Sequence, residues 1–110
     1  MGYIRHDAIV VTSWANKYIL PAIHKAEELG LNVSNITESS TNGYCSFLIA
    51  PDGSKEGWPE SDKGDTARDE WKTWAHNQRD AEKLWIDWVH ISYAGDEEKD
   101  TKIVEHHKLD

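Results

Sequence analysis

A short apolar run near the N-terminus is followed directly by a stretch with helical spacing, and this change of period limits the possible folds. Asp7–Ser13 (DAIVVTS) is rich in β-branched residues and short, so it predicts a central strand buried on both faces. Over Trp14–Leu29 the apolar residues recur at helical spacing, which predicts a helix with one buried face. We expect the regular helix to begin near Asn16–Tyr18, because Pro21 is best tolerated close to the first turn. Gly30 is suited to end the helix, because it can take a left-handed conformation without steric cost.

The following segments predict a β-hairpin. Leu31–Glu38 starts with alternating apolar residues and then slips in register, which is typical of a bulge or an early strand end. Asn42-Gly43 carries the strongest hairpin-turn signal in the chain, and Tyr44–Ala50 has the composition of the returning strand. Pro51–Ser54 favours a tight turn and so ends this strand.

A second helix is predicted over roughly Asp65–Lys83, after a polar loop over Lys55–Gly64. Asp65 is the expected N-cap, with Ser61 as the alternative if the helix begins earlier. The side chains expected to face the sheet share helical spacing, and they are Ala67, Trp71, Trp74, Ala75 and Gln78.

Leu84–Tyr93 alternates so strongly that it predicts a strand with two distinct faces. We assign to the core the face made of Trp85, Val89, Ile91 and Tyr93. The face expected to point away from the core carries Ile86, Trp88, His90 and Ser92. Thr101–His107 follows an acidic loop and predicts an edge strand that pairs with Leu84–Tyr93.

The order of elements is therefore β-α-β-β-α-β with an additional C-terminal edge strand. This order predicts an α+β domain of the ferredoxin-like arrangement, in which two helices cover one face of an antiparallel sheet. A length of 110 residues is close to the commonest domain size, so residues 1–110 are expected to form one domain. Many functions occur on this arrangement, so it does not select one by itself.

The charged residues are unequally distributed along the chain. There are 12 basic and 20 acidic residues, a net charge of −8, and residues 51–110 account for −7 of it. This excess of negative charge argues against direct binding to nucleic acid or to an anionic membrane surface. No run approaches the roughly 18 apolar residues of a membrane-spanning helix.

The N-terminus and the cysteine content indicate the cellular compartment in which the protein is expected. Met1–Asp7 lacks a basic region followed by an apolar one, so no signal peptide is expected. Cys45 is the only cysteine, which excludes an internal disulfide and a cysteine-rich zinc site. We therefore expect a reducing, cytoplasmic location.

Six tryptophans are a heavy load for a chain of this length. Trp71, Trp74 and Trp85 are expected to pack in the core, because each indole can bury about 150–250 Å² and a small domain needs that area.

The other three tryptophans are candidates for ligand binding. Trp14 lies at a strand-to-helix junction, Trp58 in a polar loop, and Trp88 on the strand face assigned to solvent. An exposed aromatic flanked by polar residues is suited to stacking on a base or anchoring a partner. Lys55 and Arg68 lie near Trp58 in sequence and could hold a phosphate group, the alternative being that they balance neighbouring carboxylates.

No motif for catalysis or metal binding is present. The six histidines include neither an H-x-H nor an H-E-x-x-H spacing, so no metal or other cofactor is expected. The chain has no G-x-S-x-G nucleophile elbow and no glycine-rich phosphate loop. Asp7 and Asp87 start or interrupt apolar runs, and we expect both to be partly buried in structural salt bridges. We therefore assign no catalytic residue and do not expect an enzyme.

Two stretches, MGYIRHDAIVVTSW and APDGSKEGWPESDKGD, resemble small uncharacterised proteins encoded by bacteriophages and prophages. The resemblance implies an accessory factor that acts on host machinery. Some proteins of this kind sequester the small nucleotide signals of host immunity, and others resemble nucleic acid in charge and block a host nuclease.

Two functional hypotheses follow. The first is a non-enzymatic module that binds a small nucleotide-like ligand through Trp14, Lys55, Trp58, Arg68 and Trp88, and a homo-oligomer would supply a deeper cleft for it. The alternative is an inhibitor that presents its acidic half to a basic, nucleic-acid-binding host protein. An enzyme of unrecognised class, and a structural protein that assembles through the edge strand Thr101–His107, are further alternatives.

Overall fold

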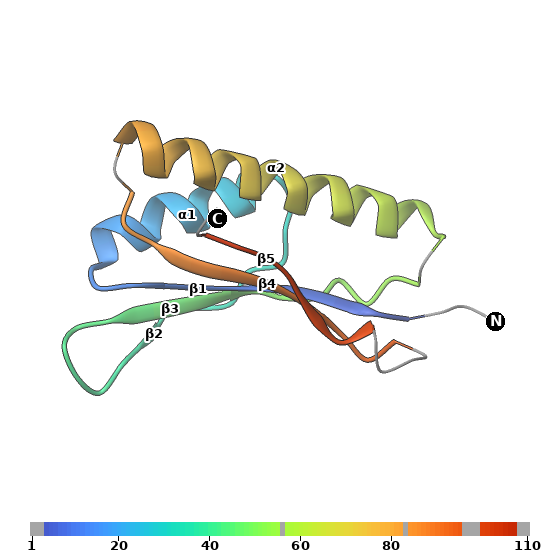
Figure 1. The fold of residues 1–110 in the computed structure, drawn as a ribbon, viewed down its shortest axis with the longest axis horizontal. Helices are drawn as coiled ribbons and strands as arrows, with labels where there is room; N and C mark the ends of the chain where they lie inside the picture. Colours follow the sequence, from blue (N-terminus) through green and yellow to red (C-terminus); the bar gives the residue numbers. More distant parts are fainter. Residues whose placement is uncertain (1–3, 56, 83, 96–99, 108–110) are drawn as a thin grey trace.

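Five strands form one antiparallel sheet, and two helices lie on one of its faces (Figure 1). The computed structural model describes residues 4–55, 57–82, 84–95 and 100–107. The elements are β1 (His6–Ser13), α1 (Asn16–Glu28), β2 (Thr37–Glu38), β3 (Cys45–Ile49), α2 (Pro59–Glu82), β4 (Asp87–Tyr93) and β5 (Lys102–His106). The strand order is β2-β3-β1-β4-β5, and every pairing is antiparallel. The predicted α+β class, with two helices on an antiparallel sheet, is confirmed.

β1 is the central strand, as its β-branched composition predicted. It pairs with β3 on one side and β4 on the other, so that Ile9 lies between Ile49 and His90. Ile9 and Val11 point toward the helices and are fully buried, whereas Val10 is 37% exposed. The prediction that this strand is buried on both faces is therefore wrong, because the helices cover only one face of the sheet.

α1 begins and ends where its sequence predicts. Ile19, Ala22 and Ala26 form its buried face. Gly30 has a φ of 79°, its N–H donates to the carbonyl of Glu27, and the next N–H, of Leu31, donates to the carbonyl of Ala26. This pair of bonds is a Schellman motif, which satisfies carbonyls that the end of the helix would otherwise leave unpaired.

α2 begins six residues earlier than predicted, at Pro59 rather than Asp65. A proline suits the first helical position because its missing N–H is not needed there. Gly64, which suggested a loop, lies inside the helix, and a Cβ atom at this position would overlap the carboxylate of Asp52. The glycine therefore allows the loop after β3 to approach α2 closely.

The assignment of the two faces of β4 is wrong. The side chains that point toward the helices are the alternate set, namely Ile86, Trp88, His90 and Ser92. Trp88 is only 3% exposed and packs edge-on against Trp71, with 5.7 Å between the ring centroids. Trp71 is fully buried and Trp74 partly buried, as predicted, but Trp85 is 46% exposed.

The strand predicted over Leu31–Glu38 is much shorter. Only Thr37–Glu38 pairs as β2, and Val33 makes an isolated bridge to Ile49. β5 is an edge strand paired with β4, as predicted, with a register irregularity opposite His90 and Ile91. In the part of the chain that the structure describes, neither helix has an apolar stretch suited to crossing a membrane.

Candidate functional site

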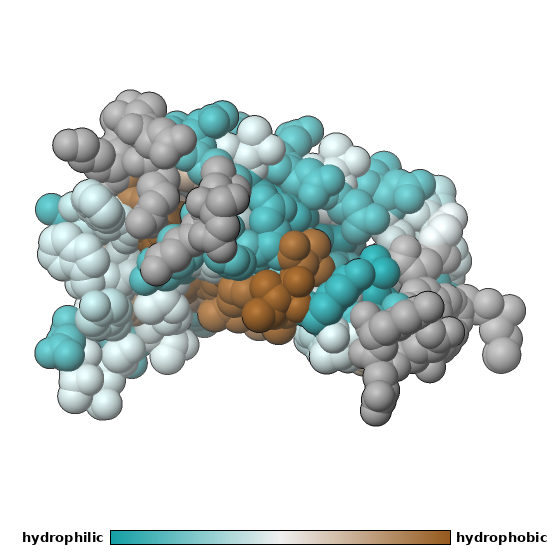
Figure 2. Space-filling model, viewed as in Figure 1, coloured by the Kyte–Doolittle hydropathy of each residue, from teal (hydrophilic) through white to brown (hydrophobic). Residues whose placement is uncertain are grey.

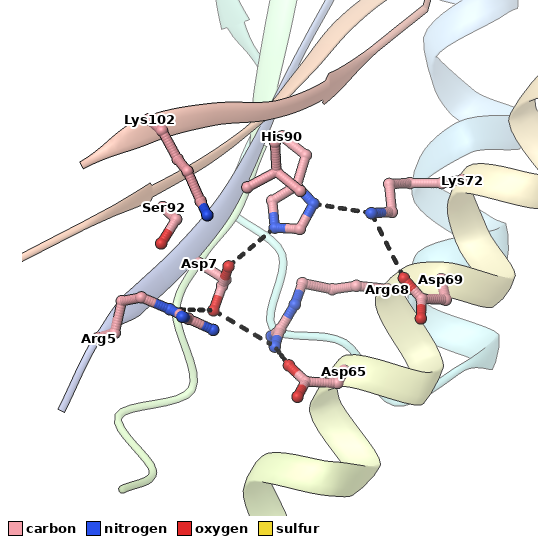
Figure 3. Close-up of a pocket in the computed structure, with 10 residues that line it drawn as sticks. Arg5, Asp7, Asp65, Arg68, Asp69, Lys72, His90, Ser92 and Lys102 are labelled. Carbon is pink, nitrogen blue, oxygen red and sulfur yellow. Dashed lines mark hydrogen bonds and ion pairs between the residues drawn. The ribbon is translucent and has the colours of Figure 1, made fainter. Parts of the chain in front are cut away.

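A polar pocket of about 270 Å³ lies between α2 and the strands β1, β4 and β5 (Figure 3). The side chains that line it are mainly charged, and they are Arg5, Asp7, Asp65, Arg68, Asp69, Lys72, His90, Ser92, Lys102 and Val104. We call it the basic pocket, because four cationic side chains face three carboxylates there in a chain whose net charge is −8.

Local structure explains how these residues meet. Arg68 and Lys72 lie four residues apart on α2, so both project from the same face of the helix. His90 and Ser92 alternate on β4 and point to the same side of the sheet. Ser92 is the cross-strand partner of Lys102 on β5, which brings that lysine to the pocket from the edge of the sheet.

Asp7 is the acidic centre of the pocket. Its Oδ1 accepts a hydrogen bond of 3.0 Å from Nε2 of His90. Its Oδ2 lies 3.9 Å from Arg68 and 3.8 Å from Arg5. Burial raises the pKa of Asp7, but the hydrogen bond from His90 and the charges of Arg68 and Arg5 outweigh it and hold the pKa below its ordinary value. Asp7 is therefore ionised and buried in a structural salt bridge, as predicted. The predicted partial burial of Asp87 is wrong, because its side chain is 66% exposed although it pairs with His107.

His90 lies between Asp7 and Lys72, and both of its ring nitrogens are engaged. Nζ of Lys72 is 2.8 Å from Nδ1 of His90 and also forms ion pairs with Glu105 at 3.1 Å and Asp69 at 3.4 Å. An ammonium group can only donate hydrogen bonds, so Nδ1 accepts and Nε2 carries the proton that is donated to Asp7. A general base needs a nitrogen within reach of a substrate proton, and His90 must break one of these bonds to provide it.

Glu105 of β5 connects the polar contacts around Lys72 to His76, which lies one helical turn further toward the C-terminus of α2. Its carboxylate lies 3.1 Å from Lys72 and 3.0 Å from Nε2 of His76. Burial raises the pKa of Glu105. The hydrogen bonds from His76 and Lys72 and the charge of Lys72 outweigh burial, so the pKa lies below its ordinary value. The network therefore ties the edge strand β5 to α2.

Arg68 connects the pocket to the loop after β3. It is 5% exposed and forms ion pairs with Asp7, Asp65 and Asp52. Because three carboxylates surround this guanidinium, its first role is to neutralise them.

Lys102 and Arg5 form the accessible side of the pocket. The side chain of Lys102 extends from β5 into the pocket, toward Ser92 and Asp7 (Figure 3). Among the described residues, Lys102 has no carboxylate within ion-pair distance, and its side chain is exposed to solvent. Lys102 can therefore meet an anion without giving up an existing ion pair.

The structure does not bring the five predicted ligand-binding residues together. Trp14 is 52% exposed just after β1, whereas Trp58 is 47% exposed just before α2, at the opposite end of the sheet (Figure 1). Lys55 lies over the ring of Trp58, 5.5 Å from its centroid. Arg68 lines the basic pocket, and Trp88 lies in the core beneath α2 rather than on an outward face.

Of the ten residues that line the pocket, only Arg68 was predicted to bind a ligand, and the four basic or histidine side chains that were missed are Arg5, Lys72, His90 and Lys102. A usable signal was present on α2, where Arg68, Lys72 and His76 recur every four residues and so form one basic stripe. The other three come from separate strands or their flanks, and no short motif connects them.

The lowered pKa values of Asp7 and Glu105 predict how stability depends on pH. The ordinary values are 3.8 and 4.5, so the ionised carboxylates stabilise the fold above these values. This stabilisation is lost as the pH falls through the lower folded-state pKa values. We expect the free energy of unfolding in urea to fall from about pH 4.5 downward, and Glu105→Gln to reduce the slope. Equal stability of the wild-type protein at pH 5 and pH 3 would contradict the prediction.

Within the described ranges, no group of three or more histidine, cysteine, aspartate or glutamate side chains is arranged to hold a metal ion. Comparison of the chain with protein-family models, with curated proteins and with solved structures gave no significant match.

Proposed function

We propose that this protein is a non-enzymatic binding protein that holds a small anionic, nucleotide-like ligand in the basic pocket. The observation that carries the proposal is the position of Lys102, which extends into the pocket toward Ser92 and Asp7 and has no ion-pair partner among the described residues. In a chain with 20 acidic residues, an unneutralised cation directed into a concave site favours an anion.

The rest of the pocket supports binding rather than catalysis. Arg68 and Lys72 are held by carboxylates, and both nitrogens of His90 are occupied. These contacts fix the wall of the pocket and supply positive charge near it. They leave no side chain in the network ready to take or give a proton.

The size of the pocket limits the ligand class. Sites for drug-sized molecules usually measure about 300–1,000 Å³, and this one measures about 270 Å³. A single phosphate-bearing group, such as a phosphate or a ribose phosphate, matches that volume. No tryptophan, tyrosine or phenylalanine lines the pocket, and the ring of His90 is held by Asp7 and Lys72, so a base would extend outside it.

We also infer that the sheet follows the ferredoxin-like arrangement. The support is the central β1 between β3 and β4, with β2 beyond β3. The two-residue β2 and the added β5 are departures from that arrangement. The resemblance of two segments to phage-encoded proteins supports a more specific proposal, namely an accessory factor that sequesters a host nucleotide signal.

The direct test is calorimetry with inorganic phosphate, AMP and cyclic AMP, using the wild-type protein and Lys102→Gln. We expect saturable binding of at least one of the three, weakened about tenfold in Lys102→Gln, because one charged contact is worth about 1.4 kcal/mol. Lys17→Gln is the matched control, since it removes the same charge from an exposed lysine of α1 outside the pocket. Equal affinities of the two variants, or no heat with any ligand, would reject the proposal.

The acidic surface of α2 favours a second candidate, the inhibitor of a basic host protein. Glu60, Asp62, Asp69 and Glu70 are all exposed on this helix. Such a surface speeds association with a basic partner, and the effect falls steeply with salt. If the amount of partner captured from host lysate changes neither with salt nor with Glu70→Lys, the inhibitor hypothesis is contradicted.

A further inference from the structure

The face of the sheet opposite the helices carries a continuous apolar centre. Its outward side chains form two rows across the strands, because the pairing places Leu48, Val10 and Val89 side by side, and next to them Ala8, Ile91 and Ile103. Val10 is 37% and Ile103 65% exposed, Leu48, Val89 and Ile91 are partly buried, and Ala8 between them is only 2% exposed. Figure 2, which looks onto the β5 edge of the sheet, shows a hydrophobic patch at this edge, beneath the hydrophilic surface of α2.

This face is almost free of charge. The outward positions of β1, β3 and β4, all of which the structure describes, include no lysine or arginine and one carboxylate, Asp87, whose Oδ1 lies 3.0 Å from Nε2 of His107. Polar rows that contain Thr12 and Ser46 on one side, and Tyr93 on the other, border the apolar centre. An apolar centre with a polar rim is the usual composition of a protein interface.

We propose that a second copy of this chain covers the face, so that two sheets pack face to face about a twofold axis. The charge distribution favours this occupant. The exposed carboxylates of α2 lie on the opposite side of the sheet. This packing therefore places the α2 helix of each copy on the outside of the dimer and keeps the two sets of negative charges apart. A twofold interface also requires a patch that matches itself, and a neutral apolar face does so.

The size of the face agrees with a weak dimer. Four strands spaced about 4.8 Å apart, with about seven residues of roughly 3.3 Å each, give a face of roughly 440 Å² per copy. The two copies would bury about 900 Å², which is in the range of weak, transient interfaces. A shallow hollow of about 270 Å³ beside Val10, lined also by Thr12, Val89 and His106, leaves room for a partner's side chain.

Edge-to-edge pairing is a poorer solution for this sheet. β5 is the edge strand, and its register with β4 is interrupted opposite His90 and Ile91. Irregular pairing of this kind twists an edge and hinders the addition of another strand. The apolar face, not the edge, is therefore the surface that we assign to association.

Sedimentation equilibrium of the full chain, from about 1 μM to about 1 mM, tests the proposal. We expect a reversible dimer of the wild-type protein, and a dissociation constant raised at least about tenfold by Val10→Lys and by Ile103→Lys. Both variants lower the net negative charge, so weaker association cannot come from a larger overall charge and reflects the lysines that both copies would place in the interface. Leu20→Lys is the matched control, because Leu20 is 43% exposed on α1 and the change is the same.

Circular dichroism shows whether each variant is folded, and Ile103→Lys at a largely exposed site keeps the test valid if Val10→Lys does not fold. A wild-type protein that stays monomeric over the whole range overturns the proposal. The proposal is also overturned if Ile103→Lys leaves the dissociation constant unchanged, or if Leu20→Lys raises it as much as the variants of the apolar face do.

Discussion

Replacing Trp71 with alanine is expected to lower the free energy of unfolding by about 4 kcal/mol. Trp71 is fully buried at the centre of the core, with its ring 5.7 Å from Trp88 and 6.2 Å from Trp74. Its Nε1–H donates a hydrogen bond of 3.0 Å to the carbonyl of Ala22, which fixes α2 against α1. The substitution leaves a large cavity and removes this bond together with the ring contacts.

Equilibrium unfolding in urea, followed by circular dichroism, measures this effect. Trp71→Phe keeps most of the ring and is expected to cost only about 1–2 kcal/mol, so it remains measurable if the alanine variant does not fold. Trp14→Ala removes the same side chain at a position that is 52% exposed, and it should cost less than about 1 kcal/mol. Equal losses for the alanine variants at positions 71 and 14 would contradict the central place of Trp71.

The fold was predictable from local patterns wherever one signal dominated. α1 has a clear period, and Gly30 at its end takes the φ of 79° that only glycine adopts readily. The start of α2 was missed because Pro59 and Gly64 are helix breakers in general. Here Pro59 occupies the first position, and Gly64 permits a close contact with Asp52. These reasons depend on three-dimensional neighbours, which local patterns do not contain.

The two faces of β4 were exchanged for a related reason. A period of two identifies two faces but does not say which one is covered. His90 and Ser92 lie on the inward face, where they belong to the buried polar network. By composition this face is therefore less apolar than the outward face, which carries Val89 and Ile91. The buried network therefore misled the assignment of the strand that holds its central histidine.

The basic pocket was only partly predictable. Asp7 was expected to be buried in a salt bridge, and Arg68 was a candidate for phosphate binding, but each was considered with its neighbours in sequence. Their contact spans 61 positions and depends on how α2 crosses β1. Lys102 reaches the pocket only because β5 pairs with β4, and the partner of an edge strand does not follow from its composition.

Removing the carboxylate of Asp7 is expected to destabilise the fold by about 3 kcal/mol in Asp7→Ala. Asp7 is 8% exposed and offsets the charges of Arg68 and Arg5 while it accepts the hydrogen bond from His90. Without it these donors remain buried with fewer acceptors, which costs more than the loss of an exposed pair. Asp52→Ala is the matched control, since Asp52 pairs with the same arginine but its side chain is 38% exposed, and we expect a loss below about 1 kcal/mol.

The pH dependence of this difference separates the charge of Asp7 from its shape. The folded-state pKa of Asp7 lies below 3.8, so its contribution is complete above that value and disappears as the pH falls through the folded-state pKa. The gap in unfolding free energy between the wild-type protein and Asp7→Ala should therefore narrow between pH 6 and pH 2.5. Asp7→Asn keeps an acceptor oxygen without the charge, so we expect it to lie between the two proteins at pH 6. A gap that stays constant over this range would mean that Asp7 acts through packing alone, and the ionised centre assigned to the basic pocket would be wrong.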